Sequence, residues 1–332
     1  MNLHWDTDIL GRDYQCASFS LGSDPVPEGN EGEIFGSLVR HLPHGENTEQ
    51  YNRRPALLFV HGMTDYFFHR HVAEHFYAQG FAVYALDLRK CGRSHRKGQT
   101  WHYASHLSIY FQELDIAAQT LLQTHPTIVP IAHSTGGLIV CHWLNYLRIS
   151  NPLTLARFPG AILNSPWLSM MAPAPIVRIA RPLITMTAKI RPRVALKTRS
   201  SSVYGKSLHI HGDGEWDYNL QWKPFEGRQK FVGWVAAVDK AQRLIHQGRI
   251  NCGIPLLCLS SDASASALPL AAHADAVINV EHISQWGPHL SEHVSIQPIP
   301  GAKHDVFLSS RAPLAQVFQT CDRWLDAEKP KR

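Results

Sequence analysis

Short apolar runs alternate with amphipathic stretches along most of the chain. Ala56–Val60 and Phe81–Leu86 are continuous apolar runs of strand length, and we interpret both as buried strands. Tyr66–Gln79 lies between them, and its apolar residues recur every four positions, which predicts a helix that ends at Gly80. The first part of the chain therefore has the order strand, helix, strand.

The same alternation continues toward the C-terminus. Further buried strands are predicted at Thr127–Ala132, Ala161–Asn164, Ile254–Leu259 and Val294–Ile299, and two earlier strands around Cys16–Leu21 and Glu33–Leu42. Further helices are predicted at His106–Thr124, Gly136–Arg148, Val280–Trp286 and around Leu314–Leu325. Because parallel strands need crossover connections, the pattern predicts an α/β fold with a mostly parallel sheet and helices on both faces. Ligand sites of such sheets lie at the carboxyl ends of the strands.

The alternation is interrupted between about Met170 and Arg249. This segment has several prolines among short apolar pieces and no clean buried strand. We therefore expect one α/β core formed by residues 1–169 and 250–332. Residues 170–249 are expected to form an inserted, mainly helical cap.

Composition narrows the class of protein without changing the expected fold. An apolar fraction of 44% and a charged fraction of 18% are typical of a globular protein, and no apolar run is long enough to cross a bilayer. The N-terminus lacks the features of a signal peptide, and six scattered cysteines favour reduced thiols, so we expect a cytoplasmic location. A net charge of +5 is too small and too dispersed to indicate a nucleic-acid partner.

Positive charge is concentrated in one segment of the expected cap. From Arg178 to Lys206 there are eight basic residues and no acidic one. Blocks of like charge usually form a solvated surface, which is one interpretation. The other is a surface that associates weakly with anionic lipid.

The strongest sign of chemistry is Ala132-His-Ser-Thr-Gly-Gly137, at the junction of a predicted strand and a predicted helix. Such a turn is sharp, so it needs small flanking residues, and it lifts the serine hydroxyl above the sheet. The Thr135 amide then lies at the start of a helix, where it can stabilise an oxyanion. The loop His61-Gly62-Met63 follows an earlier strand and offers the Met63 amide as a second donor. Ser134 is therefore the candidate nucleophile.

A serine nucleophile needs a general base, and the base needs a carboxylate that orients it. His304 directly follows the last predicted strand, which brings it to the sheet edge that carries Ser134. His133 is expected to point away from the hydroxyl and to pack in the interior. Asp262 and Asp275 both follow the strand after the interruption. We favour Asp275, with the residues between the two as a loop insertion, and Asp262 stays the alternative.

One histidine cluster could suggest a metal site. His69, His71 and His75 lie close together with Glu74, and two of the histidines would share a helix face. The order of an HExxH zinc motif is absent, however, and no matching third ligand is near. We expect neither a metal ion nor another cofactor.

Taken together, five motifs resemble one known family. They are His61-Gly62, Asp87-Leu-Arg with Gly92 and Ser94, Ala132–Gly137, Asn164-Ser-Pro-Trp and Gly301-Ala-Lys-His304. The chain resembles the monoacylglycerol lipase and lysophospholipase branch of the α/β hydrolases, also described as serine aminopeptidases, over residues 30–170 and 250–325. The resemblance implies the α/β-hydrolase fold, a triad of Ser134, Asp275 and His304, and an oxyanion hole formed by Met63 and Thr135. Two departures are alanine in place of glycine at position 132 and the long loop before Asp275.

The resemblance also implies an activity. A serine hydrolase of this branch cleaves carboxylic esters, here expected to be acyl esters of lipid type, through an acyl-enzyme on Ser134. An aminopeptidase is an alternative, for which Glu215 and Asp217 of the cap could bind a free amino terminus. Thioesterase, acyltransferase and carbon–carbon hydrolase activities are further alternatives. A non-catalytic binding protein with a hydrolase fold is an alternative of a different class.

Overall fold

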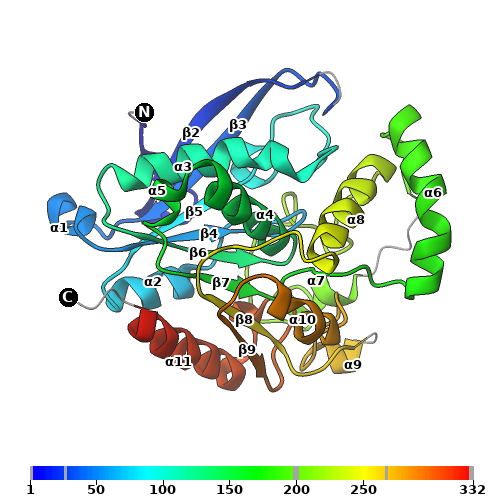
Figure 1. The fold of residues 1–332 in the computed structure, drawn as a ribbon. Helices are drawn as coiled ribbons and strands as arrows, with labels where there is room; N and C mark the ends of the chain where they lie inside the picture. The colour runs from blue at the N-terminus through cyan, green and yellow to red at the C-terminus, as the bar shows by residue number, and fades with distance from the viewer. Residues whose placement is uncertain (1–2, 26–27, 197–201, 266–267, 329–332) are drawn as a thin grey trace.

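The computed structural model describes residues 3–25, 28–196, 202–265 and 268–328. A central sheet of nine strands in the order β1-β2-β3-β5-β4-β6-β7-β8-β9 runs through this part of the chain (Figure 1). The strands are β1 (Asp6–Asp8), β2 (Gly11–Ser23), β3 (Glu33–His41), β4 (Ala56–Val60), β5 (Ala82–Asp87), β6 (Ile128–His133), β7 (Ala161–Asn164), β8 (Leu256–Ser261) and β9 (Val294–Ile299). From β5 to β9 all neighbours are parallel, whereas β1, β2 and β3 add an antiparallel edge. The predicted mostly parallel sheet is confirmed.

The apolar runs form the centre of the sheet because they are buried on both faces. β4 pairs with β5 on one side and β6 on the other, and all its residues are buried. β4, β7 and β9 have the predicted bounds. β9 lies at the edge of the sheet, and its exposed residues alternate with less exposed ones as expected for a strand with one solvated face.

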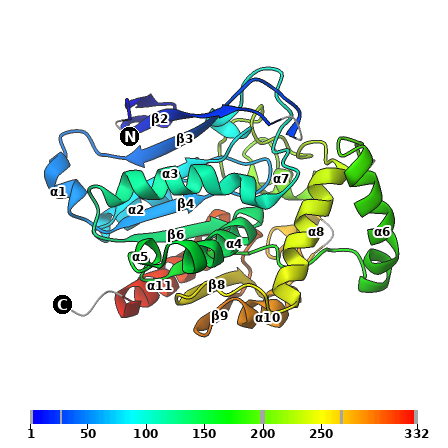
Figure 2. The same cartoon turned by 45° about the horizontal axis from the view of Figure 1, so that its top comes forward.

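Helices cover both faces of the sheet (Figure 2). Those outside the interruption are α1 (Thr48–Asn52), α2 (Arg70–Ala78), α3 (Phe111–Leu122), α4 (Thr135–Ser150), α5 (Pro152–Leu155), α9 (Leu268–Ala271), α10 (Glu281–Trp286) and α11 (Arg311–Glu328). Apolar residues of α2 and α11 belong to the core on one face, whereas those of α3, α4 and α10 belong to the core on the other. The helix predicted at Tyr66–Gln79 begins only at Arg70, because the Phe67 amide donates a hydrogen bond to Asp87 of β5 at 2.9 Å. That part of the prediction was wrong.

The described part of the segment between β7 and β8 contains three helices, α6 (Ala174–Ile190), α7 (Val203–Leu208) and α8 (Val232–His246). α6 is longer than the short pieces expected, and it continues through Pro182 although proline removes one backbone hydrogen bond. Trp234 and Val238 of α8 are buried in the core, while α6 packs on the outer side of α8 at the edge of the molecule (Figures 1 and 2). Within the described ranges, no helix is long and apolar enough to cross a bilayer.

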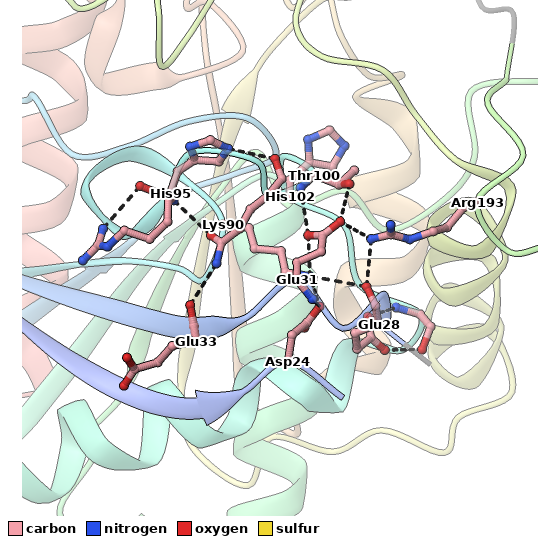
Figure 3. Close-up of polar contacts among 12 residues, drawn as sticks. Asp24, Glu28, Glu31, Glu33, Lys90, His95, Thr100, His102 and Arg193 are labelled. Atoms are coloured by element: carbon pink, nitrogen blue, oxygen red, sulfur yellow. Dashed lines mark hydrogen bonds and ion pairs between the residues drawn. The ribbon is translucent and has the colours of Figure 1, made fainter. Parts of the chain in front are cut away.

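A buried polar cluster ties this segment to the N-terminal strands (Figure 3). The Lys90 ammonium lies 3.0 Å from Asp24 and 3.2 Å from Glu31 in the turn between β2 and β3. Glu31 also accepts hydrogen bonds from Thr100 and from the guanidinium of Arg193, which follows α6. These contacts keep the pKa of Glu31 at about 2 despite its partial burial, which opposes them. Arg193 therefore fixes the chain after α6 to the core.

Candidate active site

Ser134 occupies the sharp turn between β6 and α4. Its φ of +52° lies in the left-handed region that non-glycine residues rarely adopt, and the strain aims its side chain away from the sheet. Gly136 lets α4 begin close to the end of β4. A β carbon at this position would lie 2.7 Å from the Val60 carbonyl oxygen and closer still to that of His61. The side chain at position 132 is fully buried, and alanine is small enough to fit there in place of glycine.

The structure brings Ser134, His304 and Asp275 together in one hydrogen-bonded chain. His304 Nε2 lies 2.9 Å from Ser134 Oγ, and His304 Nδ1 lies 2.8 Å from Asp275 Oδ2. The serine is 8% exposed, the histidine 2% and the aspartate 0%, so water competes little for these hydrogen bonds. With the hydrogen of the imidazole on Nδ1, Nε2 is free to accept the serine proton.

Asp275 reaches this place because the chain returns to the end of β8. Its amide donates a hydrogen bond to Ala263 O at 2.8 Å, and its carbonyl accepts one from Ala265 N at 2.7 Å. Its Oδ1 accepts hydrogen bonds from the amides of Val277 and Ile278, which leaves Oδ2 for His304. Asp275 is thereby held beside the residues that directly follow β8. The exposed alternative, Asp262, instead accepts a hydrogen bond from Gly301 N at 3.1 Å, in the loop that carries His304.

The two expected oxyanion donors lie at the same site. Thr135 is the first residue of α4, so its amide belongs to the unsatisfied first turn of the helix. Met63 follows β4, and within the described residues its amide has no hydrogen-bond acceptor. Both residues line the cavity onto which Ser134 opens. Gly62 permits this approach, because a β carbon there would lie 3.1 Å from Ser134 Cβ.

A cavity of about 320 Å³ contains the candidate nucleophile and base. Such a volume is within the ~300–1,000 Å³ typical of small-molecule sites. Its wall combines residues from the core loops with residues from the β7–β8 segment. The apolar part is formed by Met63, Trp167, Met171, Phe225, Val277 and Ile278.

The cavity also has a polar side that sequence reasoning missed. Lys223, which is buried, forms an ion pair with Asp65 and faces the ring of Tyr204. The Tyr204 ring packs against His304 with 5.5 Å between centroids, and its buried hydroxyl has no partner within the described residues. Burial raises the pKa of Tyr204 well above its usual value, so the phenol stays a hydrogen-bond donor. Asp65 and Lys223 are 158 positions apart, so no sequence motif marks them.

Asp305 supports the loop that carries the candidate base. Its carboxylate accepts a hydrogen bond from Asn164 Nδ2 at 2.7 Å and lies 2.9 Å from His69 Nε2. Burial alone raises the pKa of a carboxyl, but His133 and His69 outweigh it, so the pKa of Asp305 is well below its usual value. His133 packs against the His304 ring, and burial lowers its pKa to about 4. It is not hydrogen-bonded to the Ser134 hydroxyl among the described contacts.

The remaining candidate residues lie elsewhere. Glu215 and Asp217 are exposed, and neither belongs to the described lining of the cavity. His71 Nε2 lies 2.8 Å from the Phe307 carbonyl oxygen, and His75 Nε2 lies 3.0 Å from Asp322. These histidines therefore contact different partners in the packing between α2 and α11.

A mostly parallel sheet with a serine at the sharp turn after β6 is typical of the α/β hydrolases. A family model described as serine aminopeptidase, S33, matches residues 51–310. The chain belongs to this family.

Known lipases are among its relatives. A monoacylglycerol lipase of Mycolicibacterium smegmatis is 25% identical over 279 residues, which cover 78% of this chain and 84% of the relative. Two solved structures share the fold at lower identity. A soluble variant of monoglyceride lipase from Saccharomyces cerevisiae aligns with a TM-score of 0.64 and 15% identity, over 94% of this chain and 96% of that one. The monoacylglycerol lipase of Paleococcus ferrophilus aligns with a TM-score of 0.60 and 18% identity, over 83% and 97%.

Proposed function

We propose that the protein hydrolyses carboxylic esters through an acyl-enzyme on Ser134. The observation that carries this proposal is the hydrogen-bonded chain from Ser134 through His304 to Asp275, placed at the ends of three parallel strands. These two hydrogen bonds connect a nucleophile, a base and a carboxylate in the order that acyl transfer requires. The lipase relative supports an ester over other acyl compounds.

In the proposed reaction, Ser134 Oγ attacks the ester carbonyl carbon while His304 Nε2 takes the hydroxyl proton. The negative charge that develops on the carbonyl oxygen is stabilised by the amides of Met63 and Thr135. The tetrahedral intermediate then expels the alcohol, which receives its proton from His304. A water molecule attacks the acyl-enzyme with His304 again as base, which releases the acid and restores the serine. Asp275 holds the imidazole in the required tautomer.

The substrate proposed for this cavity is an acyl ester of lipid type. The acyl chain would lie along the apolar wall, which includes Trp167 and Phe225, and the alcohol part would face Asp65, Lys223 and Tyr204. Residues 170–249 would serve as the cap that covers the acyl chain of the substrate. Glu215 and Asp217 do not belong to the described lining, so we do not propose that they bind a free amino terminus.

Labelling with a fluorophosphonate probe tests the nucleophile. We expect the wild-type protein to be labelled and Ser134→Ala to be unlabelled. Ser260→Ala, which changes a buried serine at the end of β8, is the matched control and should be labelled normally. Equal labelling of Ser134→Ala and wild type would refute the assignment.

A substrate panel tests the reaction. Chromogenic acyl esters of graded chain length are compared with aminoacyl amides at equal concentration, and kcat/KM is measured for each. We expect turnover of the esters, with kcat/KM changing with acyl length, and little turnover of the amides. A preference for the amides would favour the aminopeptidase alternative.

A further inference from the structure

A second cavity, of about 370 Å³, lies between residues of α6, α8 and α10. Helices α6 and α8 lie side by side in both views (Figures 1 and 2). The described lining of this cavity has no residue in common with that of the cavity that contains Ser134. Five of its lining residues can carry positive charge, and Asp239 is the one acidic residue among those described. The five are Arg178, Arg181, Arg243, His246 and His282.

Asp239 neutralises only part of this positive charge. Its carboxylate accepts hydrogen bonds from Arg181 Nε at 2.9 Å and from Arg181 Nη2 at 3.0 Å, which is the two-point pairing that a guanidinium favours. Arg243 Nε lies 3.2 Å from the same carboxylate, but within the described residues this buried nitrogen has no hydrogen-bond partner. One carboxylate therefore serves two guanidinium groups.

Arg178 adds a third guanidinium to the same cavity. It lies on α6, three residues before Arg181, and it has neither an ion pair nor a side-chain hydrogen bond among the described contacts. It is the first residue of the basic segment noted in the sequence, of which Lys197 and Arg199 lie outside the described residues. No aspartate or glutamate occurs at the positions outside the described ranges. The charge of Arg178 is thus left for a ligand.

The two histidines of the cavity experience its positive charge. Burial lowers the pKa of His246, and the positive charges of His282 and Arg181 lower it further. Burial also lowers the pKa of His282, and its buried Nδ1 has no hydrogen-bond partner within the described residues. A buried polar atom without a partner is costly. An anion in the cavity would favour the protonated rings and accept the hydrogen of that nitrogen.

The cavity also has an apolar part. Met170, Val177 and Trp286 belong to its lining, and the ring of Trp286 is stacked on that of His246 with 3.8 Å between centroids. The volume is within the ~300–1,000 Å³ typical of small-molecule sites. A ligand that combines an anionic group with a small apolar group would therefore match both parts of the lining.

This cavity adjoins the wall of the candidate active site. Gln242 Nε2 donates a hydrogen bond to Trp167 O at 3.0 Å, and His246 Nε2 lies 2.8 Å from Leu168 O. Trp167 in turn lines the cavity that contains Ser134. A ligand bound between α6 and α8 would therefore contact residues that hold one wall of the other cavity.

We propose that the cavity between α6, α8 and α10 binds a small phosphate monoester, with the phosphate between Arg178 and Arg243 and the organic group against Val177 and Trp286. A phosphate monoester supplies nearly two negative charges and three acceptor oxygens, which suit guanidinium groups from two helices. Binding here is separate from hydrolysis of the ester at Ser134, so either proposal can fail while the other holds.

Isothermal titration calorimetry of the full chain with Ser134→Ala tests the proposal. Phenyl phosphate is a monoester with about two negative charges near pH 8, and methyl phenyl phosphate is a diester with one, as in the head groups of phospholipids. We expect phenyl phosphate to bind with a Kd of about 1 mM or lower, and the diester to bind at least about ten-fold more weakly.

Single substitutions locate the binding. Arg178→Met should weaken the binding of phenyl phosphate at least about ten-fold, because it removes charge-assisted hydrogen bonds to the ligand and breaks no ion pair of the described structure. Arg249→Met is the matched control, because Arg249 is exposed after α8 and lines a different cavity, and it should bind normally.

Four results would overturn the proposal. They are no binding of phenyl phosphate up to about 10 mM, equal affinity for the diester, unchanged affinity in Arg178→Met, and equal weakening in Arg249→Met. Unchanged affinity in Arg178→Met would place the bound phosphate elsewhere, for instance in the cavity that contains Ser134.

Discussion

At the scale of single residues, the site depends on two hydrogen bonds, one between Ser134 and His304 and one between His304 and Asp275. Ser134 could be predicted because its turn needs small neighbours in a fixed pattern, and His304 because it follows the last strand. Position in the sequence favours Asp275 over Asp262 but does not decide between them. The choice depends on a tertiary contact, the pairing of Asp275 with residues 263–265, which no local pattern shows.

Replacing the two aspartates by asparagine distinguishes their roles. Asp275→Asn keeps the size of the side chain but disfavours the required tautomer of His304, so we expect kcat for an ester to fall by about four orders of magnitude. Asp262→Asn removes the negative charge but keeps an oxygen that can accept the hydrogen bond of the Gly301 amide, so kcat should stay within about ten-fold of wild type. Steady-state kinetics checks both. A larger loss in Asp262→Asn than in Asp275→Asn would reverse the assignment.

The close approach at Gly136 has a cost that can be measured. A methyl group there would meet the carbonyl oxygens of Val60 and His61, which are backbone atoms that cannot move aside. We expect Gly136→Ala to lower the free energy of unfolding by about 1–3 kcal/mol, measured by urea denaturation. Gly98→Ala is not a fair control, because Gly98 has a positive φ. Gly287→Ala is better, since its new methyl group would come closest to the flexible end of Ile296 and would make only an ordinary contact with Cys258 Sγ, and it should cost less.

At the scale of elements, buried strands were predicted well because continuous apolar runs have few other interpretations. β4, β7 and β9 have the predicted bounds. The start of α2 and the length of α6 were not predicted. The first depends on a hydrogen bond to Asp87, and the second on packing against α8, and both partners are distant in sequence.

The buried cluster around Lys90 is expected to contribute strongly to stability. Lys90→Met fills a similar volume but leaves Asp24 and Glu31 without their cation, and Asp24 is almost fully buried. Breaking a buried pair in this way costs about 3–5 kcal/mol. Urea denaturation should show this loss, with Lys97→Met, at an exposed lysine, as the control. A loss no greater than that of the control would contradict the role of the cluster.

At the scale of the whole molecule, buried neutral histidines make stability depend on pH. Burial lowers the pKa of His102 to about 3 and that of His133 to about 4. Unfolding returns both to about 6.5. Between these values the unfolded chain binds more protons, so the stability that these residues contribute is complete above pH 6.5 and is lost as the pH falls toward 3–4.

The free energy of unfolding should therefore fall between pH 7 and pH 5. Each of the two histidines contributes a slope of up to about 1.4 kcal/mol per pH unit over this interval. Urea denaturation at several pH values measures the slope. His102→Gln should reduce it by the contribution of one titrating group, which is up to about 1.4 kcal/mol per pH unit. An unchanged slope in His102→Gln would show that His102 is not the source.

The ion pair between Arg193 and Glu31 also affects which segments of this protein can be exchanged with those of a relative. The family model matches the chain from residue 51 onward, yet the carboxylate that holds Arg193 comes earlier. A chimera that received residues 170–249 alone would carry a guanidinium without its acceptor. An exchange with a relative should therefore transfer the turn between β2 and β3 together with the helices after β7, although 162 positions separate Glu31 from Arg193.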